Sequence, residues 1–444
     1  MNDFALEYRV GFFVLDVLIH AGHSAYLVGG CVRDHILGRP CKDVDVCTSA
    51  TPDQVGALFL KTKLVGAKFG VCLVEVDNTT IEVATFRKEG AYTDSRHPDL
   101  VTLATDIMVD LRRRDFTMNA LLMDESGEVI DLFRSRGSLD ARTIHSVGEP
   151  DDRFIEDPLR MLRAIRFACQ LDFHIGSSTE AAILSNAPSI QNISKERVTQ
   201  ELVKILTSGQ AAKGLTLLSH LGLLKFILPE VENLRAVPQN PKYHPEGNAF
   251  IHTLKLLEQL PAGCSLTLAL AALLHDTGKL PTLAMKDGQP TFYGHELDSV
   301  LITHAVLTRM RFSNDTCRAV ERLVAQHMRF RNANVMRRGK LLAFVGQADF
   351  PEMLQLHRLD ALAGSGNLDH WNFCAKTLLE APPELLNHPP TLINGDDLIA
   401  RGMKSGPGFR SFLNIVRDAQ FEGTISNREE ALALLETHME YAHG

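Results

Sequence analysis

The stretch Leu27–Thr48, LVGGCVRDHILGRPCKDVDVCT, decides how the rest of the chain is interpreted. Within it, Asp43 and Asp45 alternate with Val44 and Val46, and this period of two is typical of a β-strand. Because side chains two residues apart on a strand share a face, we expect both carboxylates to point the same way. Two neighbouring carboxylates repel each other unless a cation lies between them. A hard cation such as Mg²⁺ is commonly held by one or two carboxylates together with substrate phosphates.

The same stretch carries a glycine pair, Gly29 and Gly30, followed three residues later by Arg33. A Gly-Gly turn lets backbone N–H groups approach a phosphate closely, and a helix that begins at Cys31 would add its own N-terminal N–H groups. Taken alone, a pair of aspartates separated by one residue is more typical of a solvated surface turn. With the glycines and the arginine at this spacing, the stretch indicates a site for a nucleoside triphosphate and a metal.

Length and composition limit the class of protein. A chain of 444 residues predicts two to four domains, and contents of 45% hydrophobic and 23% charged residues are typical of a soluble globular protein. The net charge of -8 means that any RNA contact must come from local basic patches. The eight cysteines show no paired CxxC spacing, which argues against a zinc ribbon or a disulfide framework and favours a reducing compartment.

The first residues do not resemble a signal peptide, because Asp3 and Glu7 interrupt the apolar residues there. The apolar run Leu266–Leu274 is too short to span a bilayer. We therefore expect a cytoplasmic protein with no membrane partner.

A second motif is Arg112–Ala120, RRRDFTMNA. A basic triplet before a short apolar segment suits the charge of a triphosphate. A solvated charge run at a helix end would have the same composition. Arg114 and Asn119 are the candidate contacts for the nucleotide.

A third motif is Arg153–Phe167, RFIEDPLRMLRAIRF. At 100° per residue, Asp157, Arg160, Arg163 and Arg166 lie on one half of a helix, and apolar residues occupy the other half. An ordinary amphipathic helix with a solvated basic face shows the same pattern. An acid and planar guanidinium donors can also match the hydrogen-bonding edge of a nucleobase.

A fourth set combines imidazoles with carboxylates: His252, His275, Asp276 and Asp360. His275 and Asp276 are adjacent at the end of an apolar helix, and imidazole with carboxylate suits a transition metal. His295 and His327 would allow a second metal ion. Buried histidines are more often structural and an His-Asp pair is common by chance, but the ordered pattern H…HD…D resembles the HD phosphohydrolase superfamily.

The first three motifs together resemble the signatures of class II tRNA nucleotidyltransferases (CCA-adding enzymes) and of the related bacterial poly(A) polymerases. The resemblance covers nearly the whole chain. It implies an α+β fold: an N-terminal polymerase-beta-like nucleotidyltransferase domain, with a mixed sheet and helices, followed by an all-helical neck, HD body and tail. The implied boundaries are 1–145 for the catalytic head, 146–210 for the neck with base recognition, 211–375 for the body with the HD metal site, and 376–444 for the tail with tRNA contact.

The resemblance also implies an activity, namely template-independent, Mg²⁺-dependent addition of CCA to the 3′ end of tRNA from CTP and ATP. Asp43 and Asp45 would be catalytic and bind Mg²⁺. The nucleotide would be bound by Gly29, Gly30, Arg33, Arg114, Asn119, Asp157, Arg160, Arg163 and Arg166. Among these, Asp157 and Arg160 would recognise the base. A transition metal at the HD site would be held by His252, His275, Asp276 and Asp360.

Alternatives remain open at this point. An enzyme that adds only the terminal A, and a poly(A) polymerase, share the three motifs. The polar segment Phe86–Leu100, predicted as a loop, resembles the flexible loop of CCA-adding enzymes and weighs against a C-only enzyme. A metal-dependent phosphohydrolase acting at the HD site is an alternative of another class, and the sequence does not establish the oligomeric state.

Two further predictions concern supporting residues. Strands are expected at Val71–Val76 and Thr80–Thr85, where Glu82 could be a third acid but is expected to face solvent. The stretch Ser194–Glu201 is expected to open a helix whose charged residues, including Arg197, interact locally and have a structural role.

Overall fold

The computed structural model of the chain describes residues 5–41, 43–64, 70–90, 100–386, 391–403, 406 and 408–443. These residues form two compact units. The first unit contains the chain as far as Glu232, with the short segments Pro261–Gly263 and Arg309–Arg311. The second contains Asn233–Leu260, Cys264–Thr308 and the chain from Phe312 onward. The finer division into head, neck, body and tail stays a prediction.

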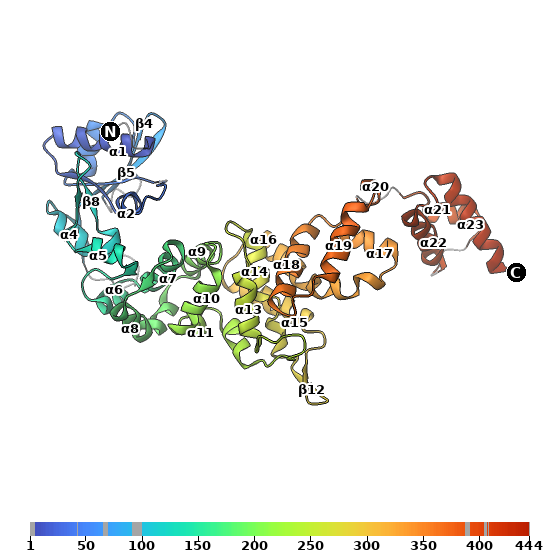
Figure 1. Cartoon of the computed structure of the whole chain (residues 1–444). Coiled ribbons are helices and arrows are strands. Elements are labelled where there is room, and N and C mark those ends of the chain that lie inside the picture. The colour runs from blue at the N-terminus through green and yellow to red at the C-terminus, as the bar shows by residue number, and fades with distance from the viewer. Residues whose placement is uncertain are drawn as a thin grey trace. The chain divides into compact units, whose positions relative to one another are not determined.

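A mixed seven-stranded sheet organises the first unit (Figure 1). The strands lie in the order β3-β4-β5-β2-β1-β8-β9, in which β2 and β5 run parallel and the other neighbours antiparallel. Their bounds are β1 (Ala25–Val28), β2 (Asp45–Thr48), β3 (Thr62–Lys63), β4 (Val71–Val76), β5 (Thr79–Thr85), β8 (Leu122–Met123) and β9 (Val129–Ile130). Two separate pairs are β6 (Arg87–Glu89) with β7 (Val101–Leu103), and β10 (Thr143–Ile144) with β11 (His174–Ile175).

The two faces of the sheet differ in chemistry. Leu27 on β1 and Val46 on β2 are paired in register and fully buried, on the face that α1 (Leu6–His20) covers. A Cβ added to Gly11 of α1 would lie 3.0 Å from the Leu27 side chain, so the helix approaches this face closely. Because side chains alternate along a strand, Asp45 and its partner Glu82 point to the opposite face. The polar site is therefore built on the face away from α1.

Short helices continue the first unit after and between the strands. They are α2 (Gly30–Ile36), α3 (Pro52–Leu58), α4 (Ile107–Arg112), η2 (Thr117–Asn119), α5 (Ser135–Asp140), α6 (Pro150–Glu156), α7 (Leu159–Leu171), α8 (Ser177–Asn186), η3 (Ala187–Asn192), α9 (Lys195–Leu206), α10 (Ala211–His220), α11 (Leu224–Ile227) and α12 (Pro229–Glu232). On α7, Met161, Leu162 and Ile165 are fully buried, which confirms the predicted apolar half of this helix.

In the part that the structure describes, the second unit is helical apart from one hairpin, β12 (Ala284–Lys286) with β13 (Gln289–Thr291). Its helices are η4 (Asn233–Ala236), α13 (Ala249–Glu258), α14 (Leu266–Leu274), η5 (Thr277–Lys279), α15 (His295–Arg309), α16 (Asn314–Gln326), η6 (His327–Val335), α17 (Arg338–Val345), α18 (Phe350–Ala363), α19 (Asp369–Glu380), α20 (Pro383–Leu386), α21 (Gly395–Ala400), α22 (Gly408–Glu422) and α23 (Arg428–His443). Residues Leu268–Leu274 of α14 are all buried, and α13, α16 and α18 pack around them. The last three helices share a small core of their own, which includes Leu398 and Leu435.

The fold class predicted from the sequence is confirmed, with short strand pairs added to the helical remainder. Two local predictions differ from the structure. The strand with the aspartate pair begins at Asp45, so Asp43 lies just before it and is exposed. The segment Phe86–Leu100 is not a loop throughout, because Arg87–Glu89 forms β6, and residues 91–99 lie outside the described residues. Among the described helices, none has the length and apolar character needed to cross a membrane.

Candidate active site

The acidic side of the site lies on the sheet. Asp45, the first residue of β2, is directly opposite Glu82 on the parallel strand β5. Burial, together with the negative charges of Glu82 and Asp43, raises the pKa of Asp45 to about 6, although Arg114 acts in the opposite direction. Carboxylate oxygens gathered in this way suit a hard cation, which would relieve their mutual repulsion.

Next to the acids, the chain turns sharply from β1 into α2. Gly29 has φ of +81°, a conformation that side chains other than glycine rarely adopt, and it is the N-cap of α2. A Cβ added at this position would also lie 3.3 Å from Nη1 of Arg114. The turn therefore depends on glycine both for its backbone angle and for the closeness of the guanidinium.

One hydrogen-bonded chain joins the three sequence motifs. Nη1 of Arg33 donates to Oδ1 of Asn119 at 2.7 Å, and Nδ2 of Asn119 donates to Oδ1 of Asp115 at 3.1 Å. Nε of Arg163 then donates to Oδ2 of Asp115 at 2.7 Å. Burial opposes ionisation of Asp115, but the charge of Arg163 and the hydrogen bond from Asn119 lower its pKa to about 2. This chain fixes α2, η2 and α7 relative to one another.

A second group of arginines lies beside this chain. Nη2 of Arg114 lies 3.2 Å from Oδ2 of the buried Asp110, and its Nη1 donates to the Asn119 carbonyl at 3.3 Å. Arg113 bonds the other oxygen of Asp110 at 2.6 Å and also lies 3.0 Å from Glu89. Glu89 lies on β6 and receives Arg87 as well, at 2.8 Å. The result is a positively charged wall whose side chains are held by internal carboxylates.

The acid and the arginine predicted to recognise the base have separate partners. Nη2 of Arg197 on α9 lies 2.7 Å from Oδ2 of Asp157, whose Oδ1 also accepts the backbone N–H of Leu159 at 3.1 Å. Arg160 bonds Glu156 at 2.6 Å and donates to the carbonyl of Arg113 at 3.0 Å. Asp157 and Arg160 are thus each held in place by neighbouring groups, and both still line the pocket.

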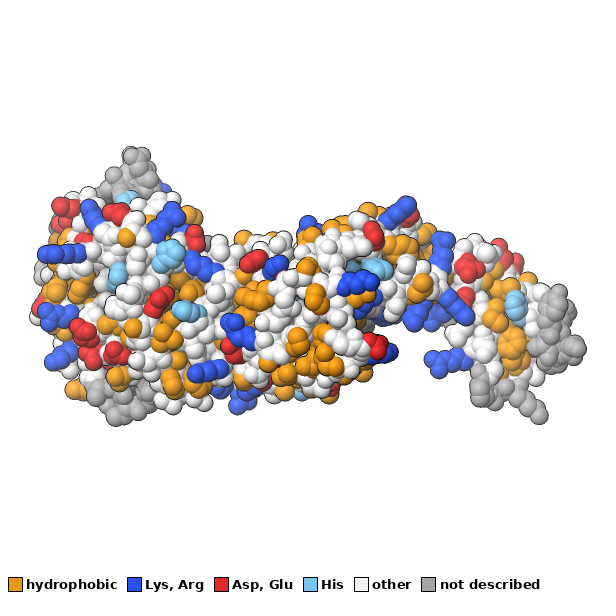
Figure 2. Space-filling model, turned by 60° about the horizontal axis from the view of Figure 1, so that its bottom comes forward, with side chains coloured by type: hydrophobic (Ala, Val, Ile, Leu, Met, Phe, Trp, Pro, Cys, Tyr) orange, Lys and Arg blue, Asp and Glu red, His pale blue; other side chains and the backbone are white. Residues whose placement is uncertain are grey.

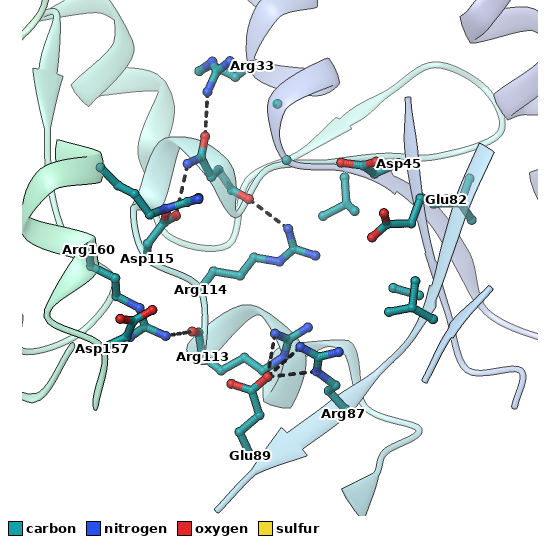
Figure 3. Close-up of a pocket in the computed structure, with 18 of the residues that line it drawn as sticks. Arg33, Asp45, Glu82, Arg87, Glu89, Arg113, Arg114, Asp115, Asp157 and Arg160 are labelled. Atoms are coloured by element: carbon teal, nitrogen blue, oxygen red, sulfur yellow. Dashed lines mark hydrogen bonds and ion pairs between the residues drawn. The ribbon is translucent and has the colours of Figure 1, made fainter. Parts of the chain in front are cut away.

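These groups surround a pocket of about 600 Å³, within the range of small-ligand sites. Figure 3 shows the carboxylates of Asp45 and Glu82 on the sheet side and Arg114 in the middle of the pocket. Asp157 and Arg160 lie on the opposite side. Eight of the nine predicted nucleotide residues line the pocket: Gly29, Gly30, Arg33, Arg114, Asn119, Asp157, Arg160 and Arg163.

Within the part of the chain that the structure describes, Asp43 and Arg166 lie outside this lining. Arg166 instead lies 3.0 Å from Glu201 of α9 and stacks over the ring of Phe167. Arg163, by contrast, contributes to the lining as well as to the Asp115 pair. The basic half of α7 is therefore divided between the pocket and the contact with α9.

The sequence analysis underestimated the contribution of three residues to the site: Glu82, Arg197 and Glu201. Glu82 is exposed, as expected, and its side chain also lies opposite Asp45 in the pocket wall, which is the position of the third acid considered from the sequence. The alternation of Glu82 with apolar neighbours was the available signal. Arg197 and Glu201 do not interact only locally. Arg197 bonds Asp157, which lies 40 positions earlier between α6 and α7, and Glu201 bonds Arg166 of α7, 35 positions earlier.

The second unit contains a buried cluster of imidazoles and carboxylates. Nε2 of His252 lies 2.9 Å from Oδ1 of Asp360, and Nε2 of His275 lies 3.4 Å from Oδ2 of Asp276 and 4.0 Å from Asp360. All four residues predicted for the HD site thus meet. Nε2 of His275 is buried and has no hydrogen-bond partner among the described residues. An orphaned imidazole nitrogen that faces carboxylates fits a transition metal.

His295 and His327 extend the cluster on the other side of Asp276. Nε2 of His295 lies 3.4 Å from Oδ1 of Asp276 and 3.2 Å from Nε2 of His327. Burial lowers the pKa of His327 to about 3, so its imidazole is neutral, as a metal ligand must be. The ligand atoms of Asp276, His295 and His327 lie within 4.8 Å of one another, as do those of His252, His275 and Asp360. The cluster can therefore hold two ions, with Asp276 between them.

Three stretches of the chain match known protein families. Residues 25–145 match the Poly A polymerase head domain, residues 172–234 the Probable RNA and SrmB- binding site of polymerase A, and residues 250–363 the HD domain. The chain is 50% identical over 206 residues to the CCA-adding enzyme of Geobacillus thermodenitrificans (strain NG80-2), which covers 46% of this chain and 51% of that protein. It is 39% identical over 268 residues to the CCA-adding enzyme of Latilactobacillus sakei subsp. sakei (strain 23K), which covers 59% of this chain and 67% of that one.

A solved structure is similar over almost the full length. The CCA-adding enzyme of Bacillus stearothermophilus in complex with CTP has a TM-score of 0.74 and 28% sequence identity, and the match covers 99% of each chain. In the sequence comparison, by contrast, the chain spans about half the length of several curated relatives that it matches.

Proposed function

The chain belongs to the family of CCA-adding enzymes, and we propose that it adds CCA to the 3′ end of tRNA from CTP and ATP in a Mg²⁺-dependent reaction. One observation carries this proposal: a single pocket places the carboxylates of Asp45 and Glu82 opposite Arg114, with Asp157 and Arg160 at its far side. The related structure that contains CTP supports the same assignment.

The acidic residues would hold the metal. Asp43, Asp45 and Glu82 offer only oxygen ligands. Burial and then the negative charges of Glu82 and Asp43 raise the pKa of Asp45, and a cation would compensate that negative charge. Bound Mg²⁺ would supply charge neutralisation for the triphosphate and activation of the tRNA 3′-hydroxyl.

The remaining residues would bind and orient the nucleotide. Arg33 and Arg114 are placed to donate to triphosphate oxygens, and the backbone at Gly29 and Gly30 can approach them closely. The carboxylate of Asp157 can accept a hydrogen bond from the amino group of cytosine or adenine, and the guanidinium of Arg160 can donate to a ring nitrogen or carbonyl. A protein acid and arginine can thus select the base, and the reaction needs no nucleic-acid template.

Contact with RNA phosphates requires local positive charge, because the net charge of the chain is -8. On most of the face shown in Figure 2, basic and acidic side chains are interspersed. The run 329–340 contains five basic residues and no acidic one. Four of these basic side chains are exposed: Arg331, Arg337, Arg338 and Lys340. We propose this run of η6 and α17 as one region of tRNA contact.

A product-length assay tests the activity. The purified protein would receive tRNA transcripts that end at the discriminator base, at C, or at CC, with Mg²⁺ and labelled CTP, ATP or both. Completion of all three transcripts to CCA, with no further extension, is expected. Extension of the CC transcript alone by one A would identify an A-adding enzyme, and long A tails a poly(A) polymerase. Asp45→Ala should abolish incorporation, whereas Asp53→Ala, an exposed acid on α3, should not.

A second activity is favoured by the buried cluster around Asp276. We propose that it binds a transition metal and hydrolyses phosphate esters, as its ordered imidazole and carboxylate ligands suit metal activation of water. Hydrolysis of bis-p-nitrophenyl phosphate with Co²⁺ or Mn²⁺ should be lost in His275→Ala and kept in Asp45→Ala. CCA addition should show the reverse pattern. Equal loss of both activities in either variant would contradict two independent sites.

A further inference from the structure

The segment between η4 and α13 contains a carboxylate that neither proposed activity uses. The side chain of Glu246 is fully buried, and its Oε1 lies 2.6 Å from Nδ1 of His252 and 2.9 Å from Nδ1 of His244. The other oxygen, Oε2, is also buried and has no hydrogen-bond partner among the described residues. Burial of a carboxylate costs the folded state free energy unless the carboxylate is paired and hydrogen-bonded, and here its partners are the two imidazoles.

The two nitrogens of His252 face different groups. Nδ1 faces Glu246, while Nε2 lies 2.9 Å from Oδ1 of Asp360 and 4.0 Å from Oδ2 of Asp276. When one imidazole nitrogen donates its hydrogen to a carboxylate, the other carries the free lone pair. The contact with Glu246 thus directs the lone pair of His252 toward the carboxylates of the cluster.

We propose that Glu246 is a positioning residue of the HD metal centre, which fixes the tautomer and the ring orientation of His252. This inference rests on the metal-binding role proposed above. A carboxylate behind a ligating imidazole also makes that imidazole a stronger ligand. Since His252 is the ligand of the cluster that Glu246 bonds among the described residues, its effect should fall on the ion held by His252, His275 and Asp360.

The same segment reaches a second ligand through a relay. Oε1 of Gln239 accepts a hydrogen bond from Nζ of the buried Lys279 at 2.6 Å, and Nζ also donates to Oδ2 of Asp276 at 2.7 Å. Residues 239–246 therefore support two ligands of the cluster from behind. This arrangement explains why a stretch without a helix or strand in the structure contains buried polar side chains.

The nearby His244 allows a different interpretation. His244, Glu246 and His252 could themselves surround a metal ion, since their ligand atoms also lie within 4.8 Å of one another. However, both Nδ1 atoms already lie at hydrogen-bonding distance from a single oxygen, and the side chain of His244 is 24% exposed. The geometry favours a shared acceptor, and removal of His244 separates the two interpretations.

The test measures metal binding in the full-length protein. Apo-protein would be titrated with Co²⁺ against a chromophoric chelator, and bound ions would be counted by mass spectrometry. Glu246→Ala should weaken Co²⁺ binding by about 10–100-fold. Glu246→Gln, which keeps a neutral acceptor, should restore part of this loss. His244→Ala should bind Co²⁺ as the wild type does. The visible spectrum of bound Co²⁺ should change in Glu246→Ala, because the orientation of one ligand changes.

The outcomes are distinct. Wild-type affinity in Glu246→Ala, with binding still abolished in Asp276→Ala, would overturn the role of Glu246 and leave the HD centre intact. Absence of any Co²⁺ binding in the wild type would overturn both. Equal losses in Glu246→Ala and His244→Ala would indicate a metal ion between these residues instead. Full CCA addition by each variant verifies that the chain has folded.

Discussion

The raised pKa of Asp45 leads to a test that combines stability with metal binding. The perturbation is Asp45→Asn, which keeps the shape of the side chain and removes its charge. In the metal-free protein the carboxylate of Asp45 is partly buried and lies against Glu82 and Asp43, and its pKa is about 6 instead of 3.8. Each unit of pKa corresponds to about 1.4 kcal/mol, so the charged form costs the folded state about 2–3 kcal/mol.

The direction of the pH dependence follows from this shift. Because the folded chain holds the proton more strongly than the unfolded chain, the unfolding free energy falls as pH rises from about 4 to about 6. Above this range the penalty is constant, and below about pH 4 it disappears because both states are protonated. Asp45→Asn should therefore be more stable than the wild type at pH 8 in the absence of metal, and nearly equal to it at pH 4.

Calorimetry in EDTA measures the difference. For a unit of this size, 1 kcal/mol shifts Tm by about 2–4 °C, so a rise of about 4–12 °C is expected at pH 8. Mg²⁺ should raise the Tm of the wild type and leave that of Asp45→Asn nearly unchanged, because ligands stabilise only the state that binds them. The control is Asp53→Asn, whose parent side chain is exposed. A lower Tm in Asp45→Asn, or the same difference at pH 4 and pH 8, would refute the reasoning.

Three further outcomes can be measured on the same pocket. Arg163→Ala removes the partner of the buried Asp115 and should lower the unfolding free energy by about 2–4 kcal/mol in urea, with the loss smaller near pH 2, where Asp115 becomes protonated. Arg197→Ala frees the side chain of Asp157, so we expect a higher KM for CTP and ATP and more misincorporation, with partial recovery in Arg197→Lys. Unchanged fidelity would show that Arg197 does not hold Asp157 in its base-recognition position. Gly29→Ala forces a strained φ of +81° and should lower kcat/KM by at least tenfold, with normal binding of tRNA in a gel-shift assay.

Regular patterns in the sequence predicted regular parts of the fold. The strands expected at Val71–Val76 and Thr80–Thr85 form the hairpin of β4 and β5, and the residues between them, Asp77 and Asn78, both have positive φ. The start of α3 is set just as locally, because Thr51 forms a capping box with Gln54 and Pro52 occupies the first turn. In these cases the determining contacts lie within a few residues, so the sequence alone contains the information.

Features set by distant contacts could not be predicted in the same way. The solvent-exposed position of Glu82 was inferred from its own strand, but its role depends on the parallel neighbour β2, which lies far from it in sequence. The entry to β2 is irregular, so the alternation of Asp43 and Asp45 did not give the position of the first carboxylate. The function of Arg197 depends on a partner 40 residues away, which no helix periodicity reveals.

The pairing of charges in the pocket distinguishes residues that support the site from residues that remain able to bind. Arg163 is committed to Asp115, and Arg166 to Glu201, so their principal effect is to hold α7 in place. Arg114 differs from Arg166 because it lines the pocket, and from Arg163 because its Nε has no hydrogen-bond partner among the described residues. A partly buried guanidinium with an unused donor in a pocket wall can bind an additional anion without losing its existing contacts. We therefore expect Arg114, rather than the arginines of α7, to make the stronger contact with the triphosphate.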